Sequence, residues 1–196
     1  MPGDRFVVLF VCHANLCRSP LAERLAVRVF GEAFGVAGAG VVFCSAGTHA
    51  FAGSPMHWGS AAVLGECGID GRDFSSRVVD AAVLRGADLV LTAGREQRAA
   101  CVRLAPVTVR RTFTLRQFTR LAAAAPAPAP AGVRVPVSVP GRLRGLVDRV
   151  DASRHLVPVV AAQVDDLPDP VDGPIEAFRD CAAEIWWSLG VVVGVM

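Results

Sequence analysis

The pattern of apolar positions near the N-terminus predicts a strand, a loop and a helix in succession. Residues 6–11 form a continuous apolar run with β-branched and aromatic members, which is typical of a central strand covered on both faces. After a loop, apolar residues recur at helical spacing between residues 21 and 30, and Ser19 and Pro20 precede them as the expected N-cap and first-turn residues. We therefore expect the loop to join a buried strand to an amphipathic helix.

The same alternation continues along the chain. Strands are expected near 40–44 and 88–92, and helices near 56–67 and 94–104. Strands that alternate with helices favour a parallel sheet with helices on both faces. The sequence therefore predicts an α/β fold with three layers, α/β/α, around a short parallel sheet of about four strands.

An Ala- and Pro-rich stretch at about 122–142 has no lasting helical or strand period, and we interpret it as a flexible loop inserted into a single domain of residues 1–196. Beyond it we expect a short helix near 143–152, a last strand near 155–160 and a final helix that begins at Pro174. The turn-rich segment DDLPDPVDGP before the final helix is predicted to be a loop.

Composition and charge indicate a globular protein without a polyanionic partner. Of the 196 residues 53% are apolar, and the formal net charge is +2, so nothing global requires nucleic acid or an anionic membrane. The start of the chain lacks a signal-peptide pattern, and no apolar run reaches the roughly 18 residues of a membrane helix. Six scattered cysteines indicate free thiols in a reducing compartment. We therefore expect a cytoplasmic protein.

The segment CHANLCRSP at 12–20 carries the candidate chemistry, because it sets Cys12 and Arg18 in a Cys-x5-Arg loop between a strand and a helix. Five intervening residues can bend the chain into a bowl whose N–H groups point inward, and the helix N-terminus adds positive charge beneath it. A tetrahedral oxyanion such as phosphate fits this bowl. We expect the substrate to be bound there by His13, Ala14, Asn15, Leu16, Cys17 and Ser19.

Cys12 is the candidate nucleophile, because amide donors, the helix dipole and Arg18 all favour its thiolate over its thiol. Arg18 offers a planar fork that can hold two phosphate oxygens. Ser19 can hydrogen-bond the sulfur or simply cap the helix, and Asn15 can adopt a left-handed conformation and brace the loop. A merely buried strand-end cysteine is the alternative for Cys12, and the Arg-Ser pair that follows disfavours it.

The loop resembles that of the low-molecular-weight protein tyrosine phosphatases, which has the form Cys-x-x-Asn-x-Cys-Arg-Ser-Pro. The matching residues are Cys12, Asn15, Cys17, Arg18, Ser19 and Pro20. The SAGT at 45–48 is similar to the family's SAGT or SAAT, and this implies that Ser45 supports Asn15. Asp169-Pro170 resembles the family's late Asp-Pro, whose acid protonates the leaving oxygen.

This resemblance covers nearly the whole chain except about 122–153. It implies a phosphomonoester hydrolase that works through a cysteinyl-phosphate intermediate and needs no cofactor. The substrate implied is a phosphorylated protein or a small phosphomonoester. The oligomeric state is left open.

Asp169 is the candidate acid, since a carboxyl group near phosphate can protonate the leaving oxygen and later activate water. Asp165, Asp166 and Asp172 compete for this role. An Asx-type turn before Pro170 is the structural alternative for Asp169 itself.

Several positions depart from the family's pattern. Val171 replaces the aromatic residue after Asp-Pro and the chain contains no tyrosine, which leaves its recognition of aryl groups open. Phe51 occupies the place of the family's other aromatic wall, or else is a packed loop residue. Phe74 and Ala93 stand where the family tends to have a histidine and an aspartate.

Other reactive side chains suggest no metal site. Cys17 can form a disulfide with Cys12 that protects the nucleophile, or can be a small buried residue. His13 can tune Cys12 or contribute only its amide. His49, His57 and His155 lack metal-ligand spacing, so no metal is expected.

Eight arginines stand against two acids between residues 85 and 120, and all 20 basic residues of the chain are arginine. Such a run either attracts phosphorylated or acidic polymers or is a solvated helix face. Stacking aromatics are scarce there, which argues against nucleic acid.

Two other functions fit the same loop. A thiol-dependent arsenate reductase on this fold needs further cysteines, of which Cys101 alone lies near the expected segment. A non-catalytic phosphate-binding module is suggested by Val171, Phe74 and Ala93.

Overall fold

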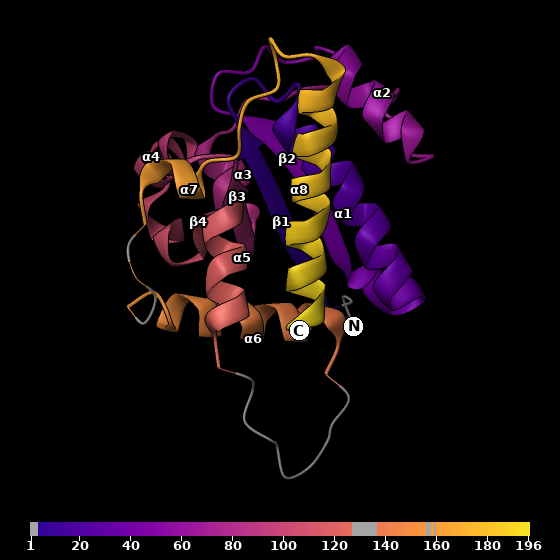
Figure 1. The fold of residues 1–196 in the computed structure, drawn as a ribbon. Coiled ribbons are helices and arrows are strands. Elements are labelled where there is room, and N and C mark those ends of the chain that lie inside the picture. The colour runs from indigo at the N-terminus through magenta and orange to yellow at the C-terminus, as the bar shows by residue number, and fades with distance from the viewer. Residues whose placement is uncertain (1–3, 127–136, 156–157, 159) are drawn as a thin grey trace.

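Four parallel strands form the centre of the molecule in the computed structural model, which describes residues 4–126, 137–155, 158 and 160–196. The strands are β1 (Phe6–Cys12), β2 (Val41–Gly47), β3 (Leu89–Thr92) and β4 (Thr112–Thr114). Their spatial order is β2-β1-β3-β4, so β1 lies inside the sheet. Because all strands are parallel, their carboxyl ends meet at one edge of the sheet, at the top of Figure 1.

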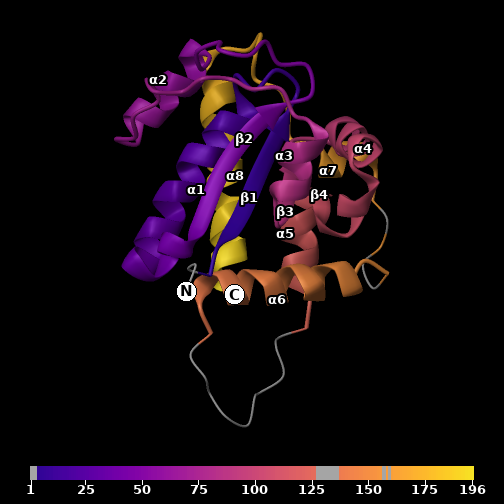
Figure 2. The ribbon, with the colours of Figure 1, turned by 180° about the vertical axis from the view of Figure 1, so that it is seen from behind.

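Helices α1 (Arg18–Phe34), α5 (Leu115–Ala124) and α8 (Ile175–Gly194) cover one face of the sheet (Figure 1). The other face carries α3 (Ala81–Gly86) and α4 (Arg95–Leu104), seen in Figure 2. Side chains of β1 alternate between the two cores, as the pleat of a strand requires: Val8 and Phe10 join the larger cluster, and Leu9 and Val11 the smaller one. The expected three-layer α/β/α fold with a short parallel sheet is confirmed.

The remaining elements lie at the two ends of the sheet or beside it. At the carboxyl edge of the sheet, α2 (Trp58–Glu66) projects from the loops that follow β2, and α6 (Val139–Ala152) crosses the opposite end (Figures 1 and 2). Three short elements complete the fold: η1 (Gly35–Gly40), η2 (Pro106–Arg111) and α7 (Ala162–Asp165). Within the described ranges, no helix combines the length and the apolar character that a membrane crossing needs.

The predicted insertion is shorter than expected at both ends. Residues 122–124 belong to α5 and residues 139–142 to α6, because Ala122 and Val139 face the core at 2% exposure each. The centre of the predicted loop, 127–136, lies outside the described residues. The helix expected near 143–152 is present and begins earlier, at Val139.

The strand predicted at 155–160 is not found in the part of that range that the structure describes. His155, Pro158 and Val160 belong to no strand, and residues 156, 157 and 159 lie outside the described part. The fourth strand is β4, which pairs with β3 and buries Phe113 completely. Its three residues were too few for a strand pattern to be visible in the sequence.

Candidate active site

The loop from Cys12 to Arg18 lies at the carboxyl edge of the sheet, because β1 ends at Cys12 and α1 begins at Arg18. Clefts at this edge are the usual ligand sites of open α/β sheets. Three loop carbonyls accept main-chain hydrogen bonds from the segment after β2: Cys12 O from Thr48 N at 3.0 Å, His13 O from His49 N at 2.8 Å and Leu16 O from His57 N at 3.0 Å. The loop is thus tied to its surroundings through its carbonyl groups.

These bonds also fix the direction of the loop amides. None of the described peptide bonds is cis, and in a trans peptide the N–H points away from the C=O of the same unit. The N–H groups of His13, Ala14 and Cys17 therefore point away from the outer partners, toward the concave side of the loop. A ring of inward donors above a helix N-terminus is a preformed anion site.

Gly47 makes this arrangement possible, although it was not among the site residues predicted from the sequence. A Cβ at this position would lie 2.6 Å from His13 O and 2.7 Å from Asn15 N. Only glycine allows β2 to approach the loop this closely. The SAGT match contained this signal, because its third residue is Gly47.

Asn15 braces the loop from behind. Its φ of 56° is left-handed, its side chain is fully buried, and Nδ2 donates to Ser19 Oγ at 2.9 Å and to Ser45 Oγ at 3.0 Å. Its Oδ1 accepts from Arg77 N at 2.9 Å. Ser45 Oγ in turn donates to Glu23 Oε2 at 2.6 Å. The Asn15 side chain thus links the loop to β2 and to the main chain at Arg77.

Ser19 contacts the sulfur and does not cap the helix. Cys12 Sγ and Ser19 Oγ lie 3.0 Å apart, and Ser19 Oγ is also 3.3 Å from Ala46 O. Since the hydroxyl already accepts from Asn15, its single hydrogen is available to the sulfur or to Ala46. The expected N-cap role is wrong: α1 begins at Arg18 and has no side-chain cap.

Arg18 and Asp169 meet above the loop. Arg18 Nη2 forms an ion pair with Asp169 Oδ2, and Nη1 donates to Leu167 O at 3.2 Å. The Arg18 side chain is 10% exposed and that of Asp169 41%. The Leu167 main chain is anchored in turn, since its N–H donates to Ala93 O at 2.7 Å. Guanidinium and carboxyl group are therefore held on the same side of the loop.

The competing acids are committed elsewhere or point to solvent. Asp165 is 2% exposed and pairs with Arg95 and Arg120. Asp166 Oδ1 accepts from the main-chain N–H of Arg95 at 2.7 Å. Asp172 is exposed. Of the four acids, Asp169 is the one in contact with Arg18.

A small cavity of about 110 Å³ brings most of the predicted site residues together. Its lining consists of Cys12, His13, Ala14, Leu16, Cys17, Arg18, Asp169 and Val171. Asn15, Ser19 and Ser45 lie behind the loop as its support. Phe51 does not line this cavity and is 85% exposed, whereas Val171 does line it. Phe74 belongs to the larger core, at 9% exposure.

The histidines near the cavity and Cys17 make contacts that stabilise the local structure. His13 stacks on His49 with ring centroids 4.4 Å apart, and His57 caps α2 by accepting from Gly59 N at 3.2 Å. Among the described residues no group of side chains is arranged to hold a metal ion. Burial, followed by the charges of Asp169 and Cys12, raises the pKa of Cys17 to about 12, so it is a thiol at neutral pH. A disulfide between Cys12 and Cys17 stays a prediction.

Fold and site together define a class: α/β/α proteins that cradle a tetrahedral oxyanion in a Cys-x5-Arg loop at the end of a central parallel strand. Within this class, the chain belongs to the family described as low molecular weight phosphotyrosine protein phosphatase, whose model matches residues 7–131.

Two curated relatives match part of the chain. A probable low molecular weight protein-tyrosine-phosphatase, EpsP, from Ralstonia solanacearum is 31% identical over 91 residues, which are 46% of this chain and 57% of that protein. An arsenate reductase from Brevibacillus brevis is 33% identical over 89 residues, 45% of this chain and 59% of that protein. The chain thus spans less than two thirds of each relative.

The solved low molecular weight protein tyrosine phosphatase of T. tengcongensis has the same fold. It superimposes with a TM-score of 0.69 over 97% of this chain and 99% of that chain, at 24% identity. At this identity the similarity establishes the fold, and the chemistry must be argued from the site itself.

Proposed function

We propose that this protein hydrolyses phosphomonoesters through a cysteinyl-phosphate intermediate on Cys12. The observation that supports this most directly is the contact between Arg18 and Asp169 in the cavity that contains Cys12. One cavity thereby combines a nucleophile, a phosphate clamp and a proton donor, which are the three groups that transfer to sulfur requires.

In the first step, the Cys12 thiolate attacks phosphorus in line with the ester oxygen. The S–P bond forms, the P–O bond breaks, and Asp169 gives its proton to the leaving oxygen. Arg18 and the inward amides of the loop hold the three remaining phosphate oxygens as their charge changes. The alcohol or phenol then leaves.

In the second step, water attacks the phosphorus of the cysteinyl phosphate. The Asp169 carboxylate takes a proton from this water, the P–O bond forms and the S–P bond breaks. The electron pair returns to sulfur, where the Ser19 hydroxyl at 3.0 Å can donate a hydrogen bond to the thiolate. Inorganic phosphate leaves and the enzyme is regenerated.

The substrate is a phosphorylated protein or a small phosphomonoester. The cavity is sized for the phosphate group, so the leaving group rests at its opening, beside the exposed residues Val171 and His13. Phe51, at 85% exposure, gives the leaving group no enclosing wall. Aryl and alkyl phosphates should therefore differ less in affinity than an aromatic-walled pocket would make them. Because the reaction needs a free thiolate, we place the protein in the reducing cytoplasm.

Arsenate reduction is the second candidate, because one relative is named an arsenate reductase. That reaction requires accessible thiols that attack in turn. Burial is the largest cause that raises the pKa of Cys17, Cys101 and Cys181, each to about 12. Cys101 is also fully buried in the smaller cluster, beneath the opposite face of the sheet. These thiols are poor nucleophiles, which favours hydrolysis.

Hydrolysis of p-nitrophenyl phosphate by the purified protein and three variants tests the proposal. Cys12→Ser should abolish turnover, and Asp169→Asn should lower kcat by about 10²-fold or more. Asp172→Asn, which removes an exposed acid in the same loop, should leave kcat unchanged. Parent-like turnover by Cys12→Ser would refute the mechanism. Phosphate binding without turnover would favour the binding module, and arsenate-dependent thiol consumption the reductase.

A further inference from the structure

A second cavity, of about 300 Å³, lies between α4, α5 and the segment that follows α6. Four arginines line it, Arg95, Arg98, Arg120 and Arg154, together with a single acid, Asp165. It shares no lining residue with the cavity above Cys12. Positive charge is therefore concentrated in a hollow that the proposed hydrolysis does not use.

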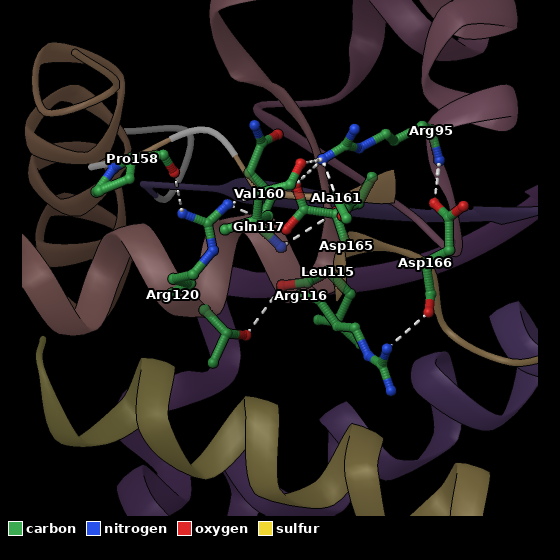
Figure 3. A network of polar contacts seen from close by, with 12 residues as sticks. Arg95, Leu115, Arg116, Gln117, Arg120, Pro158, Val160, Ala161, Asp165 and Asp166 are labelled. Atoms are coloured by element: carbon green, nitrogen blue, oxygen red, sulfur yellow. Dashed lines mark hydrogen bonds and ion pairs between the residues drawn. The ribbon is translucent and has the colours of Figure 1, made fainter. Parts of the chain in front are cut away.

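Asp165 is already occupied by two of these arginines. Its carboxylate accepts from Arg95 Nη2 at 3.0 Å and from Arg120 Nη2 at 3.1 and 3.3 Å, and the side chains converge on it from α4 and α5 (Figure 3). Arg95 also donates to Val160 O at 2.7 Å. One carboxylate thus balances two guanidinium groups, and both are held in place.

Arg154, which also lines the cavity, is held in place by its own contacts. Its Nε donates to Asp151 Oδ1 at 2.8 Å, and its guanidinium lies 3.8 Å from the ring centroid of Phe113. Asp151 also pairs with Arg110, so its charge is shared as well. Arg154 therefore presents a rigid cation to the cavity.

Arg98 has no carboxylate partner within ion-pair distance among the described residues. Its Nε donates to Thr112 O at 2.9 Å, which orients the guanidinium without neutralising it. Burial lowers the pKa of Arg98, and the positive charges of Arg154 and Arg95 lower it further, while the more weakly acting charge of Asp165 raises it. The half-buried charge of Arg98 thus faces other cations, an arrangement that an anion would relieve.

The arginine side chains and the apolar wall of the cavity favour a particular class of ligand. Guanidinium forks match the oxygens of phosphate, and several of them favour a dianion over a single carboxylate. A volume of about 300 Å³ leaves room beside a phosphate group, and Leu121, Pro158 and Val160 supply an apolar wall. We infer that this cavity binds a small molecule through its phosphate group, at a site separate from the Cys12 loop.

Part of the arginine excess at 85–120 would then serve to bind phosphate, because three of those arginines line the cavity. The site also adjoins the segment that carries the proposed acid. Asp165 ends α7, and Asp166, the next residue, accepts from the main-chain N–H of Arg95 at 2.7 Å. Neither point depends on hydrolysis at Cys12.

Thermal unfolding of an Arg18→Met variant, whose active-site clamp is removed, tests the inference. The probes are inorganic phosphate and glycerol 3-phosphate, each compared with sodium chloride at equal ionic strength. At about one hundred times its Kd, a ligand of the cavity should raise the melting temperature by roughly 5 °C or more. A response to phosphate alone assigns the site to free phosphate, and a stronger response to glycerol 3-phosphate assigns it to a phosphorylated metabolite.

Two further substitutions locate the response. Arg98→Gln should remove most of the phosphate-induced rise without lowering the melting temperature of the free protein, because it deletes a charge that faces other cations. Arg103→Gln removes the same charge from an exposed position on α4 outside the cavity and should keep the full rise. Should Arg18→Met fail to fold, the same pair is compared in the parent protein, where phosphate at the Cys12 loop adds an equal rise to both variants and Arg98→Gln should show the smaller total rise. No rise with either probe, or equal losses in the two variants, would overturn the inference.

Discussion

Asn15 combines an unusual backbone conformation with three hydrogen bonds, two of them buried and one partly buried. Its φ of 56° lies in the left-handed region, which asparagine tolerates better than most residues. Its amide group reaches Ser19, Ser45 and Arg77, so each of its polar atoms is used. The shape of the loop from Cys12 to Arg18 therefore depends on one side chain that does not line the cavity.

Replacing Asn15 by Ala should lower kcat/KM for p-nitrophenyl phosphate by at least about tenfold, since lost hydrogen bonds leave buried partners unpaired. Asn15→Gly is the matched control, because glycine keeps the left-handed backbone without strain and loses the same bonds. If the bonds brace the loop, both variants lose activity. Full activity of Asn15→Gly would show that backbone strain alone matters.

At the scale of elements, the end of β2 acts as a wall for the loop. The contact depends on Gly47, where a Cβ would lie 2.6 Å from His13 O. We expect Gly47→Ala to displace the loop and to lower kcat/KM by more than about tenfold, while the circular dichroism spectrum stays that of a folded protein. Gly65→Ala in α2, where a Cβ meets nothing within 4 Å, should behave like the parent. Equal activity of the two variants would contradict this packing argument.

Local sequence patterns predicted the strand and the loop that carry Cys12 and Arg18. They missed elements whose structure depends on packing against residues far away in the sequence. The apolar run of β1 and the Cys-x5-Arg spacing of the loop are continuous in sequence, so both were visible there. β4 has three residues, two of them threonines that are buried by their neighbours, and no periodicity marks it. The helical start of the Ala- and Pro-rich stretch was missed because α5 is specified by its packing on the core.

The sequence alone does not show which of the acidic residues before α8 approaches Arg18; the three-dimensional structure does. Asp169 and Arg18 are separated by 151 positions, and four acids crowd the segment before α8. The sequence favoured Asp169 through its resemblance to a known Asp-Pro. The fold adds a physical reason, since Asp165 is buried between Arg95 and Arg120 and is unable to approach the loop.

At the scale of the whole molecule, the buried cysteines should make the free energy of unfolding depend on pH in the alkaline range. The chain contains no tyrosine and no lysine, so thiols dominate its titration between pH 9 and pH 12. The pKa of Cys17, Cys101 and Cys181 rises from 9.0 to about 12, mainly because burial disfavours the thiolate. In this window the folded protein binds more protons than the unfolded chain. The free energy of unfolding should therefore be unaffected by these thiols below pH 9 and fall as the pH rises toward 12.

Urea unfolding at a series of pH values between 8 and 11 measures this slope. Cys101→Ala removes one fully buried thiol and should make the decline shallower by up to about 1.4 kcal/mol per pH unit. Cys67→Ala, at an exposed position, is the control and should keep the parent slope. An unchanged slope for Cys101→Ala would contradict the role assigned to buried thiols.

In the proposed mechanism, the Cys12 sulfur carries the phosphoryl group between the two steps. The Asp169→Asn variant should activate water poorly, so the cysteinyl phosphate should accumulate when it is mixed with p-nitrophenyl phosphate and quenched in acid within milliseconds to seconds. Peptide mass spectrometry of the quenched protein should then show one phosphoryl group on the peptide that contains Cys12, and sequencing fragments should place it on that sulfur. Turnover by a variant whose Cys12 never carries phosphate, or a phosphoryl group on another residue, would contradict the account.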